Sequence, residues 1–132
     1  MGFDFSKIKP KKKEALPIDP IELFHKLKVT DQNINDLWLA QGDALREWHN
    51  NRDKEDIGIV LNTGAGKTLV GLLIAESIVN ETRGKVLYAC GSIQLVEQTA
   101  EKAVGYGLHV TTYYRGEYSN DLFTRCEAPC VT

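Results

Sequence analysis

One stretch of the chain combines glycines, a lysine and a threonine in an order suited to binding phosphate groups: Thr63-Gly64-Ala65-Gly66-Lys67-Thr68. Gly64 and Gly66 allow the backbone to turn so that successive N–H groups point at phosphate oxygens. Lys67 supplies a positive charge for the outer phosphates, and the Thr68 hydroxyl is a type of ligand that Mg²⁺ accepts. The six residues therefore predict a site for a nucleoside triphosphate with Mg²⁺.

The segments on either side of this loop support the same interpretation. Residues 57–61, Ile-Gly-Ile-Val-Leu, are apolar and rich in β-branched side chains, which predicts a strand buried on both faces. Residues 69–79 are apolar nearly all round, which predicts a helix packed on a sheet. The strict phosphate-loop pattern has glycine where Leu61 stands, so a degenerate loop that keeps the fold without the nucleotide is the alternative.

Gln41 is a polar residue on an apolar helical stripe. The stripe runs from Ile34 to Trp48 with the spacing of an amphipathic helix. A buried amide costs on the order of 1–3 kcal/mol unless it is hydrogen-bonded, so we expect Gln41 to have a defined partner. One candidate is the N6 and N7 edge of adenine, which would select ATP. The other is the backbone of the phosphate loop, because most side-chain hydrogen bonds go to backbone or water.

Strand and helix patterns alternate in the rest of the chain. Residues 85–90 and 109–114 are strand candidates, Ser92 is placed to cap a helix that runs to about Val104, and residues 131–132 look like the start of another strand. Residues 120–125 have room for one or two helical turns. This order predicts an α/β fold with a parallel sheet, right-handed crossovers, and helices on both faces.

The N-terminal residues 1–18 differ from the rest of the chain. Five lysines face one acidic residue in residues 1–13, and no apolar period is sustained, which predicts a flexible basic arm before a folded region at 19–132. Asp19-Pro20 then predicts the start of a short helix. No apolar run is long enough to cross a bilayer, and three cysteines are too few and too scattered for a disulfide framework or a zinc site, so we expect a cytoplasmic protein.

Three segments of the chain resemble superfamily 2 helicases, the class that includes the DEAD/DEAH-box proteins. Residues 63–68 resemble motif I, the Walker A loop, in which T-G-x-G-K-T is usual. Residues 86–98 look like motif Ia, with Gly91 where that family usually has proline. Residues 39–45 are similar to the glutamine-bearing helix before motif I. The resemblance implies a RecA-like P-loop NTPase with a three-layer sandwich, with this chain covering a truncated, N-terminal part of the first motor domain.

The same resemblance implies which residues contact which ligand. ATP and Mg²⁺ would lie against Gln41 and residues 63–68, and DNA or RNA against Gly91, Ser92 and Gln98. The expected partners are nucleic acid through the parent helicase, together with the remaining motor domains or a second copy of the chain; no membrane is expected.

No catalytic residue is evident in this sequence beyond the phosphate charge of Lys67. After Lys67, no Asp-Glu pair follows an apolar strand, as motif II would require for Mg²⁺ and the attacking water. Three functions stay open: part of an ATP-dependent helicase or translocase, another P-loop enzyme such as a small-molecule kinase, and a nucleotide-binding fragment without hydrolysis. The first accounts for most of the motifs, and we expect the 132-residue chain by itself to be inactive in hydrolysis.

Overall fold

The computed structural model describes residues 2, 15–119 and 121–132. Most of the predicted basic arm lies outside the described residues. The elements, in chain order, are α1 (Pro20–Lys26), α2 (Leu39–Asn50), α3 (Lys67–Thr82), β1 (Leu87–Tyr88), α4 (Ile93–Tyr106), β2 (Thr111–Tyr114), β3 (Glu117–Ser119), α5 (Asp121–Thr124) and β4 (Cys130–Val131). The α/β class predicted from the sequence is confirmed.

Two of the predicted helix starts are confirmed by their capping hydrogen bonds. The Asp19 carboxylate accepts from the Ile21 N–H at 2.8 Å, and the Ser92 hydroxyl accepts from the Leu95 N–H at 3.3 Å. Each side chain satisfies a backbone donor that the first helical turn leaves without a partner. Short polar side chains at these two positions thus fix where α1 and α4 begin.

Helix α2 begins later than its apolar stripe predicted. The stripe starts at Ile34, whereas the helix starts at Leu39. The carboxylates of Asp31 and Asp36 accept from the N–H groups of Asn33 and Leu37, at 2.9 and 2.8 Å. Such local bonds offer the backbone an alternative to helical pairing, which explains the shorter helix.

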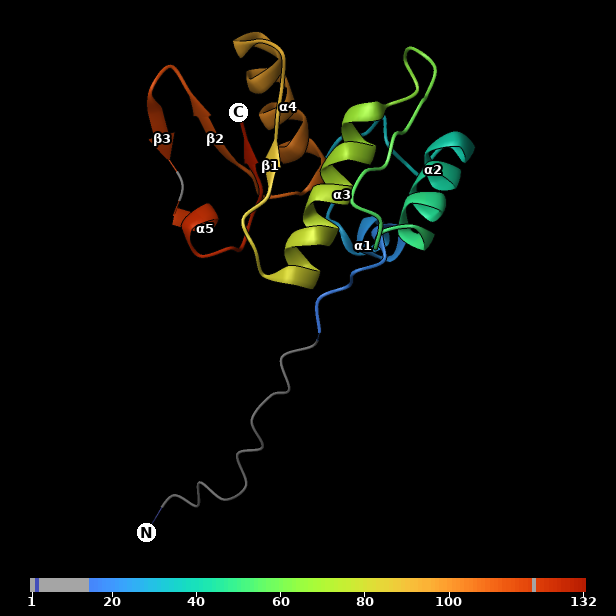
Figure 1. Ribbon diagram of the computed structural model, residues 1–132, viewed down its shortest axis with the longest axis horizontal. Helices are drawn as coiled ribbons and strands as arrows, with labels where there is room; N and C mark the ends of the chain where they lie inside the picture. The colour runs from blue at the N-terminus through green and yellow to red at the C-terminus, as the bar shows by residue number, and fades with distance from the viewer. Residues whose placement is uncertain (1, 3–14, 120) are drawn as a thin grey trace.

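The sheet has the strand order β1-β4-β2-β3 (Figure 1). Strands β1, β4 and β2 are parallel, and β3 pairs with β2 in the antiparallel sense. The β2–β3 hairpin, which the sequence did not predict, turns through Arg115 and Gly116, both at positive φ (53° and 74°). Two consecutive residues of this kind match the right-handed twist of the strands they connect.

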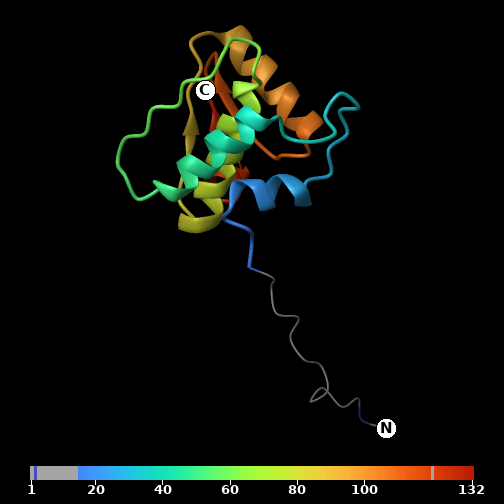
Figure 2. The same cartoon turned by 90° about the vertical axis from the view of Figure 1, so that its right-hand side faces the viewer.

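The predicted strand at residues 57–61 is wrong. This segment is extended but belongs to no strand, and it lies on the outside of the molecule in the long connection between α2 and α3 (Figure 2). Ile57 and Leu61 are half-buried, whereas Val60 is 95% exposed. An apolar β-branched run becomes a strand only beside another strand, and in the part of the chain that the structure describes no strand pairs with it.

The hydrophobic core lies between the helices and one face of the sheet. Leu45, Leu69, Leu73, Val96 and Val131 belong to it and are all nearly inaccessible to solvent. Helices α3 and α4 contact each other and the parallel strands. No helix within the described residues is long and apolar enough to span a membrane.

The opposite face of the sheet is exposed only in part, since Cys130 and Thr111 on this face are buried. Leu87 of β1 and Tyr113 of β2 share it, since the register places Leu87 and Thr111 on either side of Cys130. Leu87 is 64% exposed and Tyr113 is 46% exposed. We expected helices on both faces of the sheet. Within the described residues, the helices pack mainly on one face.

Candidate nucleotide-binding site

The phosphate loop joins the extended segment to the first turn of α3. Gly64 and Gly66 have φ of 80° and 73°, a region that favours glycine, and the Ala65 N–H donates to the Asn62 carbonyl at 3.1 Å. Helix α3 begins at Lys67 with Gly66 as its N-cap and with no side chain capping its first turn. The N–H groups of this turn carry the positive end of the helix dipole, which suits an anionic ligand.

Gln41 is buried against this loop, as its place on the apolar stripe predicted. Its side chain is only 5% exposed. Its Oε1 accepts from the Trp38 N–H at 2.9 Å, and its Nε2 donates to the Gly66 carbonyl at 3.2 Å. The contact is close, because a Cβ at position 66 would lie 2.2 Å from Nε2. Gly66 is therefore required both by its positive φ and by the amide packed on it.

The two hydrogen bonds leave part of the Gln41 amide unused. A glutamine amide has two N–H donors and two acceptor lone pairs, and the structure uses one of each. One donor and one acceptor therefore stay available for a ligand. Of the two partners predicted for Gln41, the loop backbone is the one present here, and binding of adenine is compatible with it.

Lys67 and Thr68 stand at the start of α3 with different surroundings. Lys67 is exposed, whereas Thr68 is half-buried. The Thr68 side chain lies close to the Tyr88 side chain of β1. Burial of Tyr88, with a smaller contribution from Cys90, raises the pKa of its phenol, and the nearby Thr68 hydroxyl offsets part of that rise. The phenol thus stays protonated at neutral pH and can pair with the threonine.

Thr68 offers one hydroxyl for Mg²⁺. Within residues 2, 15–119 and 121–132, no group of three or more His, Cys, Asp or Glu side chains could hold a metal by itself. Magnesium is commonly held by one or two protein ligands together with phosphate oxygens and water. The Thr68 hydroxyl beside the uncapped turn of α3 fits that arrangement, in which the ion arrives with the nucleotide.

Trp38 lies beside Gln41, and sequence analysis missed its exposure. The apolar stripe placed Trp38 in the core, yet it precedes α2 and is 61% exposed. Together with Ile34, Gln41, Gly66 and Tyr106 it lines a small cavity of about 200 Å³. An exposed tryptophan next to a glutamine amide is suited to stacking on a flat ring. In the sequence, the position of Trp38 three residues before Gln41 is the signal that could have indicated this role.

The residues expected to contact nucleic acid lie at the carboxyl end of β1. Gly91 and Ser92 line a shallow hollow with Cys90, Tyr114 and Arg115. The Ser92 hydroxyl already caps α4. Gln98 is exposed farther along α4 and does not line this hollow. Gly91 and Ser92, which are adjacent in sequence, therefore line the same hollow, and Gln98 lies outside it.

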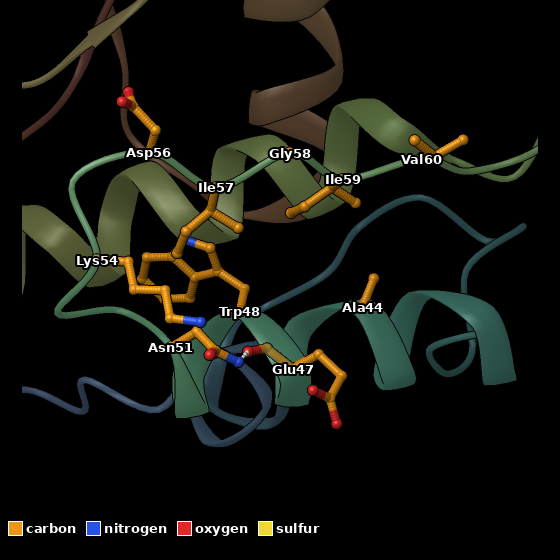
Figure 3. A pocket seen from close by; sticks show the side chains of 10 residues that line it. All are labelled: Ala44, Glu47, Trp48, Asn51, Lys54, Asp56, Ile57, Gly58, Ile59 and Val60. Carbon is orange, nitrogen blue, oxygen red and sulfur yellow. Dashed lines mark hydrogen bonds between the residues drawn. The ribbon is translucent and has the colours of Figure 1, made fainter.

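A larger hollow lies away from the phosphate loop, between α2 and the extended segment (Figure 3). The ring of Trp48 lies next to Ile57, and the side chains of Glu47, Lys54 and Asp56 are around the rim. No residue of the phosphate loop lines it. We regard it as the space beside an unpaired segment, not as the nucleotide site.

Residues 35–125, more than half of the chain, match the protein family described as type III restriction enzyme, res subunit. The chain belongs to this family. No curated protein and no solved structure matched.

The res-subunit family consists of RecA-like P-loop motor domains of the superfamily 2 helicase type, so the resemblance drawn from the motifs is confirmed. Proteins with such domains generally use ATP with Mg²⁺ and interact with nucleic acid. The match includes Gln41, the phosphate loop and the β1–α4 turn.

Proposed function

We propose that this chain binds ATP together with Mg²⁺ and is the ATP-binding portion of an ATP-dependent nucleic-acid helicase or translocase. The observation that supports the proposal most directly is the hydrogen bond from the Gln41 amide to the Gly66 carbonyl. Gly66 is the N-cap residue of α3, a helix of 16 residues whose first turn has no side-chain cap. This bond joins a residue suited to reading a base to the loop suited to holding phosphates. The family match supports a helicase-type motor domain.

Each residue of the site has a distinct role in the proposal. The loop N–H groups and Lys67 bind the phosphates, and Thr68 contributes its hydroxyl to the magnesium that the nucleotide brings. The free donor and acceptor of Gln41 pair with the adenine edge, and Trp38 stacks on the ring. Bound magnesium would neutralise negative charge on the phosphates, while these residues fix the position of the nucleotide.

DNA is the nucleic acid we propose as partner. The family is that of a restriction enzyme subunit, which favours DNA over RNA as the partner. Gly91 and Ser92 would contact the strand from the end of β1, and Gln98 from the exposed side of α4. We also propose a cytoplasmic location, because Cys90, Cys126 and Cys130 are free thiols, which suit a reducing compartment.

The decisive test is calorimetric titration of Mg-ATP into the wild-type chain and into Lys67→Ala. Lys67 is exposed and has no core role, so we expect the substitution to weaken binding without unfolding the chain. Lys102→Ala, at an exposed position of α4, is the matched control and should bind as wild type does. Equal affinity of wild type and Lys67→Ala would contradict binding at this loop.

Anisotropy of labelled single-stranded DNA and RNA tests the partner. Gln98→Ala is the variant of choice, because substitution of Ser92 would also remove the cap of α4. We expect weaker DNA binding by this variant at unchanged thermal stability. Phosphorylation of a small substrate would instead support the kinase alternative, and nucleotide binding without any effect of nucleic acid would support the fragment that does not hydrolyse ATP.

A further inference from the structure

A hollow of about 310 Å³ lies where the three parallel strands of the sheet end. Each strand contributes to its lining, through Gly91 and Ser92 after β1, Tyr113 and Arg115 at the end of β2, and Thr132 after β4. The Cys90 N–H donates to the Thr132 carbonyl at 2.7 Å, so the chain segments that follow β1 and β4 are held side by side. In open α/β sheets, ligands bind outside the carboxyl ends of the strands.

The hollow lies at the same end of the sheet as the phosphate loop. Figure 1 shows the amino end of α3 and the carboxyl ends of β1 and β2 directed toward one end of the molecule. Helix α3 also contacts β1 and α4, which join at the hollow. A ligand in the hollow would therefore lie on the same side of the protein as a nucleotide at the loop.

Arg115 gives this hollow a positive charge. Among the described residues that line it, none is acidic. Arg115 is exposed, and no ion pair within the part of the chain that the structure describes involves it. The hollow beside α2 is different, because Glu47 and Asp56 lie there together with Lys54. A guanidinium without a carboxylate partner suits a phosphate group, whose oxygens match its fork of N–H donors.

The β2–β3 hairpin places an aromatic ring close to this cation. Arg115 lies in the turn of the hairpin, where it and Gly116 have positive φ. Tyr113, two residues earlier, lines the same hollow and is 46% exposed. Proteins that bind single-stranded nucleic acid combine positive charge along the backbone with aromatic side chains on which bases stack. The hollow has both features.

We propose that this hollow binds single-stranded DNA, with Arg115 contacting a backbone phosphate and the Tyr113 ring stacking on a base. The inference rests on the proposed function and adds the β2–β3 hairpin to the surface that meets the strand. The space where a Gly91 side chain would be is open, so a strand has room to approach the end of β1. The two contacts differ physically, because the phosphate contact depends on salt and the stacking contact depends on the ring.

Anisotropy of a labelled oligothymidylate, measured at several salt concentrations, tests the role of Arg115. Each neutralised phosphate of a single strand contributes about 0.7 to the slope of log affinity against log salt. We expect Arg115→Ala to reduce the slope by about 0.7 and to bind about fivefold more weakly at roughly 0.1 M salt. Arg115→Lys keeps the charge and should keep most of the slope.

Arg83→Ala is the matched control for the loss of charge. Arg83 is exposed and follows α3, at the opposite end of that helix from the phosphate loop. Its φ of 52° is close to the 53° of Arg115, so both substitutions remove one positive charge from a residue in the same backbone conformation. Arg83→Ala should bind DNA as wild type does. Equal losses from the two variants would show an effect of net charge alone and would overturn the site.

Two substitutions of Tyr113 test the stacking contact. Tyr113→Phe keeps the aromatic face and should bind as wild type does, whereas Tyr113→Leu should bind about tenfold more weakly with an unchanged salt slope. Thermal unfolding of every variant checks the fold, because Tyr113 pairs with Tyr118 across the hairpin. If Tyr113→Leu does not fold, the comparison of Arg115→Ala with Arg83→Ala decides the matter.

The outcomes separate this inference from the proposed function. If wild type binds the DNA strand and Arg115→Ala binds it equally well with the same salt slope, this site is overturned while the proposed function stands. If wild type binds no single-stranded DNA, the proposed partner and this inference are overturned together. Tighter binding of an RNA strand of the same length would overturn DNA as the ligand of the hollow.

Discussion

At the scale of single residues, the candidate site contains two glycines, Gly64 and Gly66, with different structural roles. Gly64 has positive φ and open space around it, whereas Gly66 has positive φ and the Gln41 amide directly against it. Any side chain at 66 would displace Gln41 as well as strain the backbone. Gln41, the proposed base-reading residue, and the loop at residues 63–68 are therefore one structural unit.

Gln41→Ala should reduce the preference for ATP over GTP more than it reduces affinity for the triphosphate shared by both. The physical reason is that the unused donor and acceptor of the amide match adenine and not guanine. Competition titrations with ATP and GTP measure the two effects separately. If both nucleotides lose affinity equally, Gln41 only holds the loop through Gly66.

At the scale of elements, Arg52 joins three parts of the chain that lie far apart in sequence. From the turn just after α2, it donates to Glu81 and Ser77 of α3 at 2.9 and 3.1 Å, and to the carbonyl of Ile18 at 3.0 Å. Its guanidinium also lies 4.8 Å from the centre of the Trp48 ring. Residues just before α1 are thereby held against α3.

Arg52→Ala should lower the free energy of unfolding by about 2–4 kcal/mol, because it leaves several partners of a largely buried cation without their donor. Urea titration followed by circular dichroism measures the change. The matched control is Arg46→Ala, since Arg46 pairs with Asp43 on an exposed surface and should cost about 0.5 kcal/mol or less. Similar values for both variants would contradict a structural role for Arg52.

Glu76 of α3 is an ionisable residue whose buried surroundings disfavour its charged form. Burial raises its pKa from 4.5 to about 7, and its Oε2 is buried without a hydrogen-bond partner. The folded chain then binds a proton more tightly than the unfolded chain does. Stability should therefore fall as pH rises from about 4.5 to 7, and level off above that.

Glu76→Gln removes this charge and should flatten the pH dependence, stabilising the chain at pH 8 by up to about 3 kcal/mol relative to wild type. Urea titrations at a series of pH values provide the test. Glu47→Gln, at an exposed position of α2, should leave the dependence as it is. A wild-type stability that rises through this range would show that Glu76 is charged and paired in the folded chain.

At the scale of the whole molecule, the sheet has an edge at β1 that no other described strand pairs with. Within the described residues, strand β1 pairs only with β4, and the apolar residues Gly71, Ile74 and Ala75 of α3 lie beside it. The segment at 57–61 is extended and apolar but pairs with no described strand. Such edges promote association with another strand.

The 132-residue chain should bind ATP and hydrolyse almost none. Phosphoryl transfer depends on positioned carboxylates and on a cation at the transition state, and an arginine finger alone is worth roughly 10³ to 10⁵ in rate. This sequence has no motif II pair after an apolar strand. Single-turnover hydrolysis on monomeric material, with and without single-stranded DNA, is the measurement. A robust rate that disappears in Lys67→Ala would point to a missed acid, with Glu97 and Asp121 as first candidates.

The sequence alone determined the features that depend on local patterns. These include the glycine turn before α3, the caps at Asp19 and Ser92, and the burial of Gln41. Caps, glycine turns and helical periodicity depend on residues that are close together in the sequence. The parallel sheet also followed from the order of strand and helix patterns.

Only the tertiary structure decided what each local segment meets. Residues 57–61 have the composition of a strand but lack a neighbouring strand in the described chain, and Trp38 is exposed because Asp31 and Asp36 delay the start of α2. The packing of Tyr88 against Gly71 joins residues that are distant in the sequence. Strand pairing and side-chain contacts depend on residues distant in the chain, and a local pattern does not specify them.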